Sequence, residues 1–171
     1  MAGFLLRGWM YRNLVTYKAI GPRQSYTVSD KKLIEYIEKR SIGEKDLDVK
    51  GIIKISLSIT SDQLVFTADK NDSDPNQLIQ SKKAHCVGYS SFFAATCNYL
   101  LTQQHLSDTW TATPYVGQLF LLGHNIHTYF SSSFFNNHDF VLIEDKTSGE
   151  LYAVDPSVHD YLYIDFVSYA K

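Results

Sequence analysis

The chain has 171 residues, of which 44% are hydrophobic and 20% charged, and its formal net charge is −2. This length suits one domain that buries a sizeable core. Because the charges are balanced, the composition argues against a basic binding face, and we expect no nucleic-acid partner. No apolar run reaches the roughly 20 residues that a membrane-spanning helix needs, so we expect no span within the chain.

The first ten residues are apolar, yet they lack the basic n-region that precedes the apolar part of a signal peptide. This start fits a core helix, and it fits equally a soluble domain cut from a secreted or membrane-anchored protein. The sequence therefore leaves the cellular location open, and with it the oligomeric state.

The chain contains two cysteines, Cys86 and Cys97. On one helix, eleven residues at about 1.5 Å each would separate them by roughly 16 Å. A disulfide needs Cα atoms within about 7 Å of one another. We therefore expect the two thiols not to pair with each other, and the fold not to depend on a disulfide.

Apolar spacing predicts the secondary structure. Stripes at helical spacing predict helices over residues 4–19, about 31–41, 76–81 and 86–104. Ser29 or Asp30 would cap the second of these. Strands are expected over residues 116–122, 139–144, 150–155 and 161–166, with loops over 67–75, 105–114 and 123–136. Residues 47–66 carry both a helical and an alternating pattern, so either a helix or a strand fits them.

The order of these elements indicates the fold class. Helices come first and antiparallel strands follow, which is the α+β pattern. We expect N-terminal helices and a central Cys86-bearing helix to pack on an antiparallel sheet of about four or five strands. The many tyrosines and phenylalanines fit the faces of such a sheet.

Cys86 opens the predicted central helix, directly after His85. The N–H groups at a helix N-terminus favour the thiolate, which is the nucleophilic form of cysteine. A charged His85 would add to this effect. The alternative is a buried structural cysteine, because free cysteines are often core residues. Cys97, inside the same helix, fits that alternative well.

His138 and Asp155 lie at the same end of a predicted hairpin. His138 is seven residues before the turn at residues 145–149, and Asp155 is six residues after it. One register places both side chains within reach on one face. An aspartate there would hold the imidazole in the tautomer that a general base needs. The alternative is a polar hairpin end without chemistry.

The ordered set of three motifs resembles the transglutaminase-like family, a branch of the papain-like cysteine enzymes. In that family the nucleophilic Cys starts the central helix, the base His opens a strand, and the Asp ends the next strand, often as Val-Asp-Pro. Here the matching segments are His85–Tyr89, Asn137–Val141 and Val154–Pro156. The match covers roughly residues 45–160. It departs at Phe140, where many members carry Trp, and at Val87, where many carry a small or acidic residue.

The resemblance implies a papain-like core over residues 45–171. Residues 1–44 match no part of the family, and from their apolar spacing we expect a helical extension that packs on the core. The resemblance favours a helix to about residue 62, followed by a short extended stretch. It implies a Cys86–His138–Asp155 triad that needs no cofactor and no metal. The substrate would be a peptide or protein, and the leading reaction is that of a cysteine peptidase or amidase.

The oxyanion of such a reaction needs two donors. The backbone N–H of Cys86 is one candidate. Gln80, six residues upstream, has a spacing that resembles the glutamine of papain-like proteases, although a solvated surface glutamine explains it as well. The remaining histidines lack the spacing of a known zinc site, and we expect no metal.

Two other functions stay open. The chain could be a non-catalytic interaction module of a larger, envelope-associated protein, since this fold also occurs in that role. It could also be a protein cross-linking transglutaminase, in which an amine replaces water. The presence of all three triad residues favours an enzyme over the first alternative.

Overall fold

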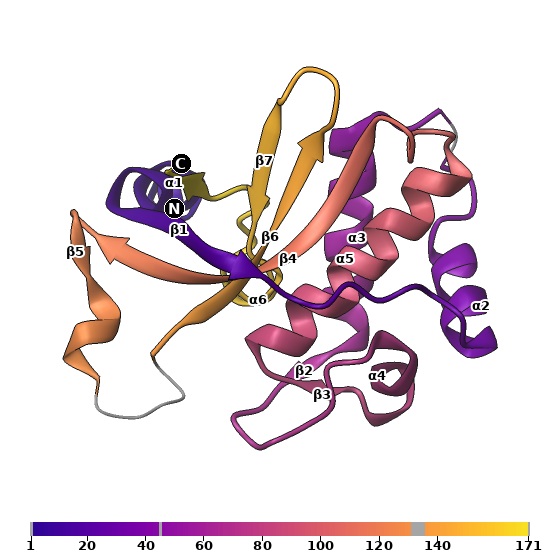
Figure 1. The fold of residues 1–171 in the computed structure, drawn as a ribbon, viewed down its shortest axis with the longest axis horizontal. Coiled ribbons are helices and arrows are strands. Elements are labelled where there is room, and N and C mark those ends of the chain that lie inside the picture. Colours follow the sequence, from indigo (N-terminus) through magenta and orange to yellow (C-terminus); the bar gives the residue numbers. More distant parts are fainter. Residues whose placement is uncertain (1, 45, 131–135, 171) are drawn as a thin grey trace.

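A six-stranded, mostly antiparallel sheet organises the structure, a computed structural model that describes residues 2–44, 46–130 and 136–170 (Figure 1). The strand order is β7-β6-β4-β1-β8, and β5 pairs with β4 outside this path. Only β1 and β8 pair in parallel within the sheet. Its strands are β1 Val15–Pro22, β4 Trp110–Leu121, β5 His124–Asn125, β6 His138–Asp145, β7 Leu151–Val154 and β8 Ser168–Tyr169.

Helices make up much of the rest of the described chain, so the predicted α+β class is confirmed. They are α1 Ala2–Leu14, α2 Lys31–Arg40, α3 Val49–Gln63, α4 Pro75–Ser81, α5 Cys86–Gln103 and α6 Pro156–Leu162, with a 3-10 turn η1 at Ile126–Tyr129. A separate parallel pair joins β2 Val65–Phe66 to β3 Lys83–Ala84. None of the helices in these described ranges is long and apolar enough to cross a membrane.

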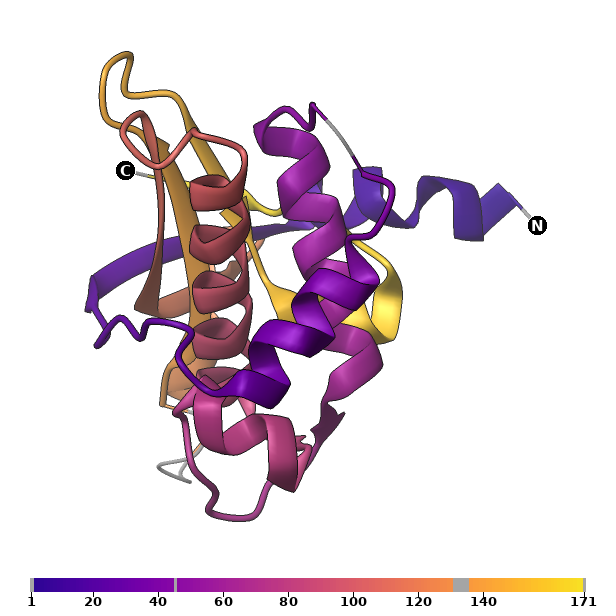
Figure 2. The ribbon, with the colours of Figure 1, turned by 90° about the vertical axis from the view of Figure 1, so that its right-hand side faces the viewer.

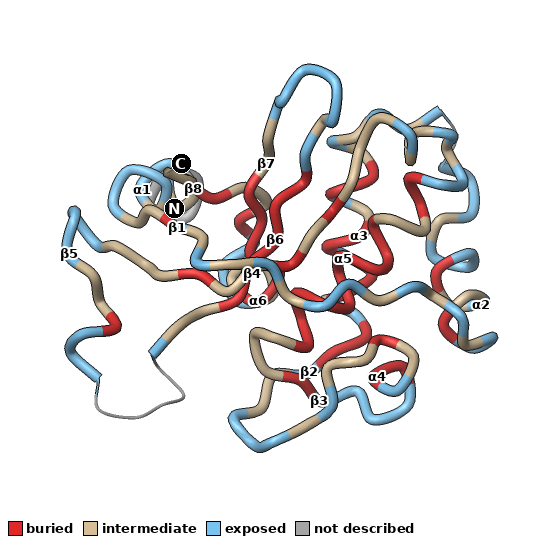
Figure 3. The backbone as a smooth tube through the Cα atoms, in the orientation of Figure 1, coloured by how far each residue is buried: buried red, intermediate tan, exposed pale blue. Residues whose placement is uncertain are grey.

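The central element is α5, which lies between the sheet and α3 (Figure 2). Its sequence is apolar around most of its circumference, and such a helix must be enclosed on several sides. Tyr89, Phe92, Phe93 and Cys97 are all fully buried. Figure 3 shows the same pattern, with buried residues concentrated in α5, α3 and the adjoining parts of β6 and β7. The predicted position of the Cys86 helix is confirmed.

Other predictions for the first half of the chain also hold. Asp30 caps α2 by accepting from the N–H groups of Lys32 and Leu33. The ambiguous segment is a helix, α3, followed by the two-residue strand β2. Both cysteines are free thiols.

The prediction of one helix over residues 4–19 is wrong in its second part. The helix ends at Leu14, and residues 15–22 form β1, which pairs with β4 along its length. Val15, Thr16 and Tyr17 are good strand formers, and the sheet gives them partners that the local pattern does not reveal. Residues 1–44 are thus not uniformly helical, although the division at residue 44 stays a prediction.

Three further boundaries differ from the prediction. The expected loop over 105–114 ends early, because β4 begins at Trp110 and pairs with Asp145 there. The expected strand over 161–166 is wrong: Pro156 starts α6, for which Asp155 is the cap, and the strand β8 comes later. The expected loop over 123–136 contains β5 and η1, while residues 131–135 of it lie outside the described residues.

Gly117 has a packing role that can be tested. It faces His138 in the β4–β6 register, and a Cβ atom there would lie 2.4 Å from the Phe140 ring. We expect Gly117→Ala to lower the free energy of unfolding by about 1–3 kcal/mol through overpacking, measured by urea denaturation. Gly21→Ala is the control, because a Cβ atom there meets nothing within 4 Å. Equal stability of the two variants would contradict the packing role.

Candidate active site

The start of α5 places Cys86 at the surface of the core. His85 caps the helix, and its Nδ1 accepts from the N–H of Val87 at 3.2 Å. One turn on, a Cβ atom at Gly88 would lie 2.8 Å from that of Ala84, so the helix start packs closely on β3. Cys86 itself is half-buried, as the first helical residue with its backbone N–H at the helix N-terminus.

The β6–β7 hairpin brings His138 and Asp155 together. Its register pairs Val141 with Val154, so His138 and Asp155 are diagonal neighbours on one face. His138 Nε2 lies 2.6 Å from Asp155 Oδ2. The predicted proximity of these two side chains is confirmed, although the prediction counted residues from the turn without knowing the register.

Cys86 and His138 line the same cavity, and His138 is the main group that lowers the pKa of the Cys86 thiol. Because Nε2 of His138 is engaged by Asp155, Nδ1 is the ring nitrogen that remains for the sulfur. Burial alone would raise the pKa of Cys86. Hydrogen bonding to His138 and His85, the charge of His138 and the backbone N–H of Asp139 outweigh burial and lower this pKa to about 6.

The charges of His138 and Asp155 support one another. Burial would lower the pKa of His138, but Asp155 and Cys86 raise it well above its ordinary value. Burial would likewise raise the pKa of Asp155, but His138, Ser157 and Tyr17 hold it below its ordinary value. The arrangement therefore favours a thiolate, an imidazolium and a carboxylate in sequence.

Asp155 is wholly buried and fully supplied with donors. Its Oδ1 accepts from the N–H and Oγ of Ser157 and from the N–H of Val158, which makes it the cap of α6. Its Oδ2 accepts from the Tyr17 hydroxyl at 2.7 Å as well as facing His138. Tyr17 comes from β1, and sequence reasoning missed it because it lies 138 positions away.

Asp139 follows His138 and is paired separately. Its carboxylate accepts from Nε of Arg23 at 2.7 Å and from Nη2 at 3.0 Å, and its side chain is fully buried. Arg23 comes from the segment after β1, and no local pattern in the sequence marks it. The fork geometry fixes the start of β6, where the backbone N–H of Asp139 helps to lower the pKa of Cys86.

A cavity of about 290 Å³ opens beside the sulfur. It is lined by Phe66, Cys86, Leu119, Ile126, His127, Phe130, Asn137 and His138. Gln80 is not among these residues and is exposed on α4. Its role as an oxyanion donor stays a prediction, while the backbone N–H of Cys86 is suitably placed at the helix start.

The remaining cysteine and histidine candidates have other roles. Cys97 is fully buried, and burial raises the pKa of its thiol to about 12. His127 lines the cavity wall, where its Nε2 accepts from the N–H of Leu119 at 3.0 Å. In the described part of the chain, no group of three or more His, Cys, Asp or Glu side chains could hold a metal ion.

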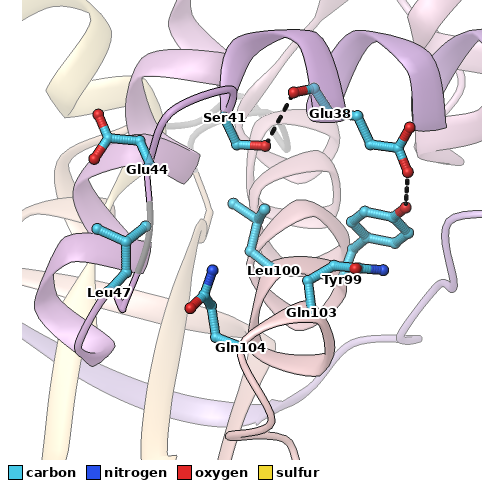
Figure 4. A pocket seen from close by; sticks show the side chains of 8 residues that line it. All are labelled: Glu38, Ser41, Glu44, Leu47, Tyr99, Leu100, Gln103 and Gln104. Atoms are coloured by element: carbon cyan, nitrogen blue, oxygen red, sulfur yellow. Dashed lines mark hydrogen bonds between the residues drawn. The ribbon is translucent and has the colours of Figure 1, made fainter.

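A hollow of about 230 Å³ lies near the other end of α5 (Figure 4). There the Tyr99 hydroxyl donates to Glu38 at 2.8 Å, and Gln103 and Gln104 form another part of the wall. Leu100, in the same wall, is fourteen residues from Cys86, which is roughly 21 Å along a helix. This hollow is therefore separate from the thiol site.

Comparisons with protein-family models, with curated proteins and with solved structures found no match to this chain.

The lowered pKa of Cys86 makes a direct prediction. Alkylation by iodoacetamide should rise with pH around a midpoint near 6, because only the thiolate reacts. His138→Ala should move this midpoint toward about 8.5, the ordinary value for a free thiol. Rates with site identification by mass spectrometry measure both. Cys97 is the internal control and should stay unlabelled while the protein is folded. A midpoint for Cys86 that does not change in His138→Ala would contradict the assignment.

Proposed function

We propose that this protein is a thiol-dependent acyl-transfer enzyme that hydrolyses a peptide or amide bond. One observation carries the proposal: beside Cys86, in the wall of the same cavity, the imidazole of His138 faces the buried carboxylate of Asp155 at 2.6 Å, and His138 helps to lower the pKa of the thiol to about 6. A lowered thiol pKa caused by a specific imidazole partner, beside a cavity, is typical of a nucleophilic cysteine.

The proposed reaction has two halves. The sulfur of Cys86 attacks the carbonyl carbon, and the backbone N–H of Cys86 stabilises the oxyanion. The C–N bond then breaks, and the leaving nitrogen takes the proton held by His138, which leaves a thioester. Water attacks the thioester while His138 takes its proton. The carboxylic acid product departs, and the thiolate–imidazolium pair is restored.

The resemblance to the transglutaminase-like family supports this proposal through the order of its three motifs, and we propose a papain-like arrangement of the core on the same ground. A cross-linking enzyme would share the first half of the reaction and use an amine in the second. A non-catalytic module would keep the fold without turnover. The roles are nucleophile for Cys86, base and acid for His138, and orienting carboxylate for Asp155.

The proposal is tested with variants of these residues. Cys86→Ala should abolish release of product from a panel of peptide amides and p-nitrophenyl esters, with the thermal midpoint of unfolding nearly unchanged. Asp155→Asn should lower kcat by about 10³–10⁴, as the loss of an orienting carboxylate does in comparable triads. Cys97→Ala is the matched control and should retain activity. Liquid chromatography with mass spectrometry, with and without an added amine, separates hydrolysis from amine transfer.

Turnover that survives Cys86→Ala would sink the proposal. Wild-type protein without turnover, on substrates that alkylate or acylate Cys86 readily, would instead favour the non-catalytic module. Unfolding of Cys86→Ala would show a structural role for the thiol, and Cys86→Ser then replaces it as the inactive variant.

A further inference from the structure

We propose that the cavity beside Cys86 binds an apolar acyl group of the substrate. This inference rests on the proposed acyl-transfer function and names the substrate class for the same site. At one end of the cavity lie Cys86 and His138, where the carbonyl would react. Much of the remaining wall is apolar and comes from Phe66, Leu119, Ile126 and Phe130.

The apolar surface continues beyond this cavity. A second hollow of about 390 Å³ adjoins it and shares Ile126 and Phe130 with it. Its other lining residues are Leu121, Leu122, His124 and Tyr129. Leu122 is 68% exposed and Tyr129 75% exposed. Exposed apolar residues next to a cavity that holds a reactive thiol indicate a place where an apolar group of the substrate lies.

The backbone around the cavity favours an apolar chain over an added peptide strand. Strand β4 pairs with β6 up to Gly117 and with β5 from Phe120 onward. Between them, the N–H of Leu119 already donates to Nε2 of His127 at 3.0 Å. An incoming peptide backbone would need main-chain partners of its own, and this part of β4 has its N–H engaged. Apolar side chains are what the wall offers.

The test is the alkylation of Cys86 by maleimides of increasing chain length, N-methyl, N-butyl and N-octyl, each normalised to its reaction with free cysteine. We expect the rate constant to rise about fourfold for each methylene that becomes buried. Phe130→Asn should flatten the series from the butyl compound onward. Tyr129→Asn should reduce only the rate gain of the octyl compound, because Tyr129 lines the second hollow and not the cavity beside Cys86. Ile42→Asn, at an exposed site outside both hollows, is the control.

A flat series overturns the inference, whether or not the enzyme turns over. Two substrates then identify the source of the acyl group: p-nitrophenyl octanoate stands for a fatty acyl chain, and N-acetylphenylalanine p-nitrophenyl ester for an apolar residue of a peptide. If one ester is hydrolysed faster than the other, the result supports an apolar acyl site, and the faster ester identifies the source of the acyl group. A steep maleimide series without hydrolysis of either ester leaves the apolar site standing and counts against the proposed function alone.

A second inference rests on separate observations. We infer that Tyr17 and Tyr11 are positioning residues that keep Asp155 ionised. The Tyr17 hydroxyl lies 2.7 Å from Asp155 Oδ2 and 2.7 Å from the Tyr11 hydroxyl. An ionised carboxylate can only accept hydrogen bonds, so the Tyr17 hydroxyl donates its one hydrogen to Asp155. Tyr11 must then donate to the oxygen of Tyr17, so both hydrogen bonds are donated in the direction from α1 toward Asp155.

These hydrogen bonds from Tyr11 to Tyr17 and from Tyr17 to Asp155 affect the reactivity of the Cys86 thiol. A buried carboxylate stays ionised only while donors replace its water. Ionised Asp155 in turn keeps His138 protonated, and protonated His138 keeps Cys86 as the thiolate. Loss of the Tyr17 hydroxyl should therefore raise the pKa at which Cys86 becomes reactive.

The test is the pH profile of Cys86 alkylation in Tyr17→Phe, which keeps the ring packed against Phe140. We expect the midpoint to move upward by about half a unit or more, as the loss of one hydrogen bond to a charged group implies. Tyr11→Phe should give a smaller shift in the same direction. Tyr99→Phe is the matched control, because it also removes a tyrosine–carboxylate hydrogen bond, to Glu38.

An unchanged midpoint in Tyr17→Phe overturns this inference and leaves the proposed function intact, because alkylation needs no turnover. Should Tyr17→Phe not fold, Tyr11→Phe decides the matter alone, since Tyr11 is only half-buried. In that variant, a midpoint equal to that of the wild type overturns the inference as well.

Discussion

The burial of one ionised carboxylate constrains much of this structure. Asp155 has no exposed surface, so every interaction that water would have made must come from the protein. The donors come from three directions: Tyr17 on β1, His138 on β6, and the first turn of α6 through Ser157 and Val158. The strand, the hairpin and the helix must therefore all be in place before the charge is stable there. The same requirement ties the hairpin to the start of α5, since the imidazole that faces Asp155 shares a cavity wall with Cys86 and lowers the pKa of its thiol.

Strand β1 makes the first part of the chain an element of the site. It lies between β4 and β8 in the sheet, and it delivers Tyr17 to Asp155 and, just beyond its end, Arg23 to Asp139. Removing this strand and the residues just after it would take the Tyr17 hydroxyl from Asp155 and the Arg23 guanidinium from Asp139, two interactions of buried carboxylates. Residues before position 44 therefore contribute directly to the site. The helix α1 joins this arrangement through the hydroxyl of Tyr11.

The sequence predicted those parts of the site that depend on residues close together in the chain. Helix α5 follows from apolar spacing after a cap, and the approach of His138 to Asp155 follows from a short turn between two strands. Tyr17 and Arg23 could not be found this way, because each meets its carboxylate across more than 100 positions. The strand β1 was predicted as helix because Val15, Leu14 and Tyr17 also fit a helical stripe; the partner strand β4, unseen in any local window, decides between the two. Asp155 also caps α6, and this second role hid the helix that follows it.

The neighbouring residues His138 and Asp139 show how alternation along a strand separates two charges. Successive side chains of β6 point to opposite faces, so the imidazole turns toward Asp155 while the adjacent carboxylate turns toward Arg23. Were Asp139 without Arg23, its negative charge beside Cys86 would oppose formation of the thiolate. With the bidentate pair in place, the Asp139 side chain is neutralised and only its backbone N–H reaches the sulfur. The thiolate therefore lies near the positive charge of His138 and, further off, that of Arg23, which is paired with Asp139. The lowered pKa of Cys86 thus depends on the strand pairing as well as on the helix that carries the thiol.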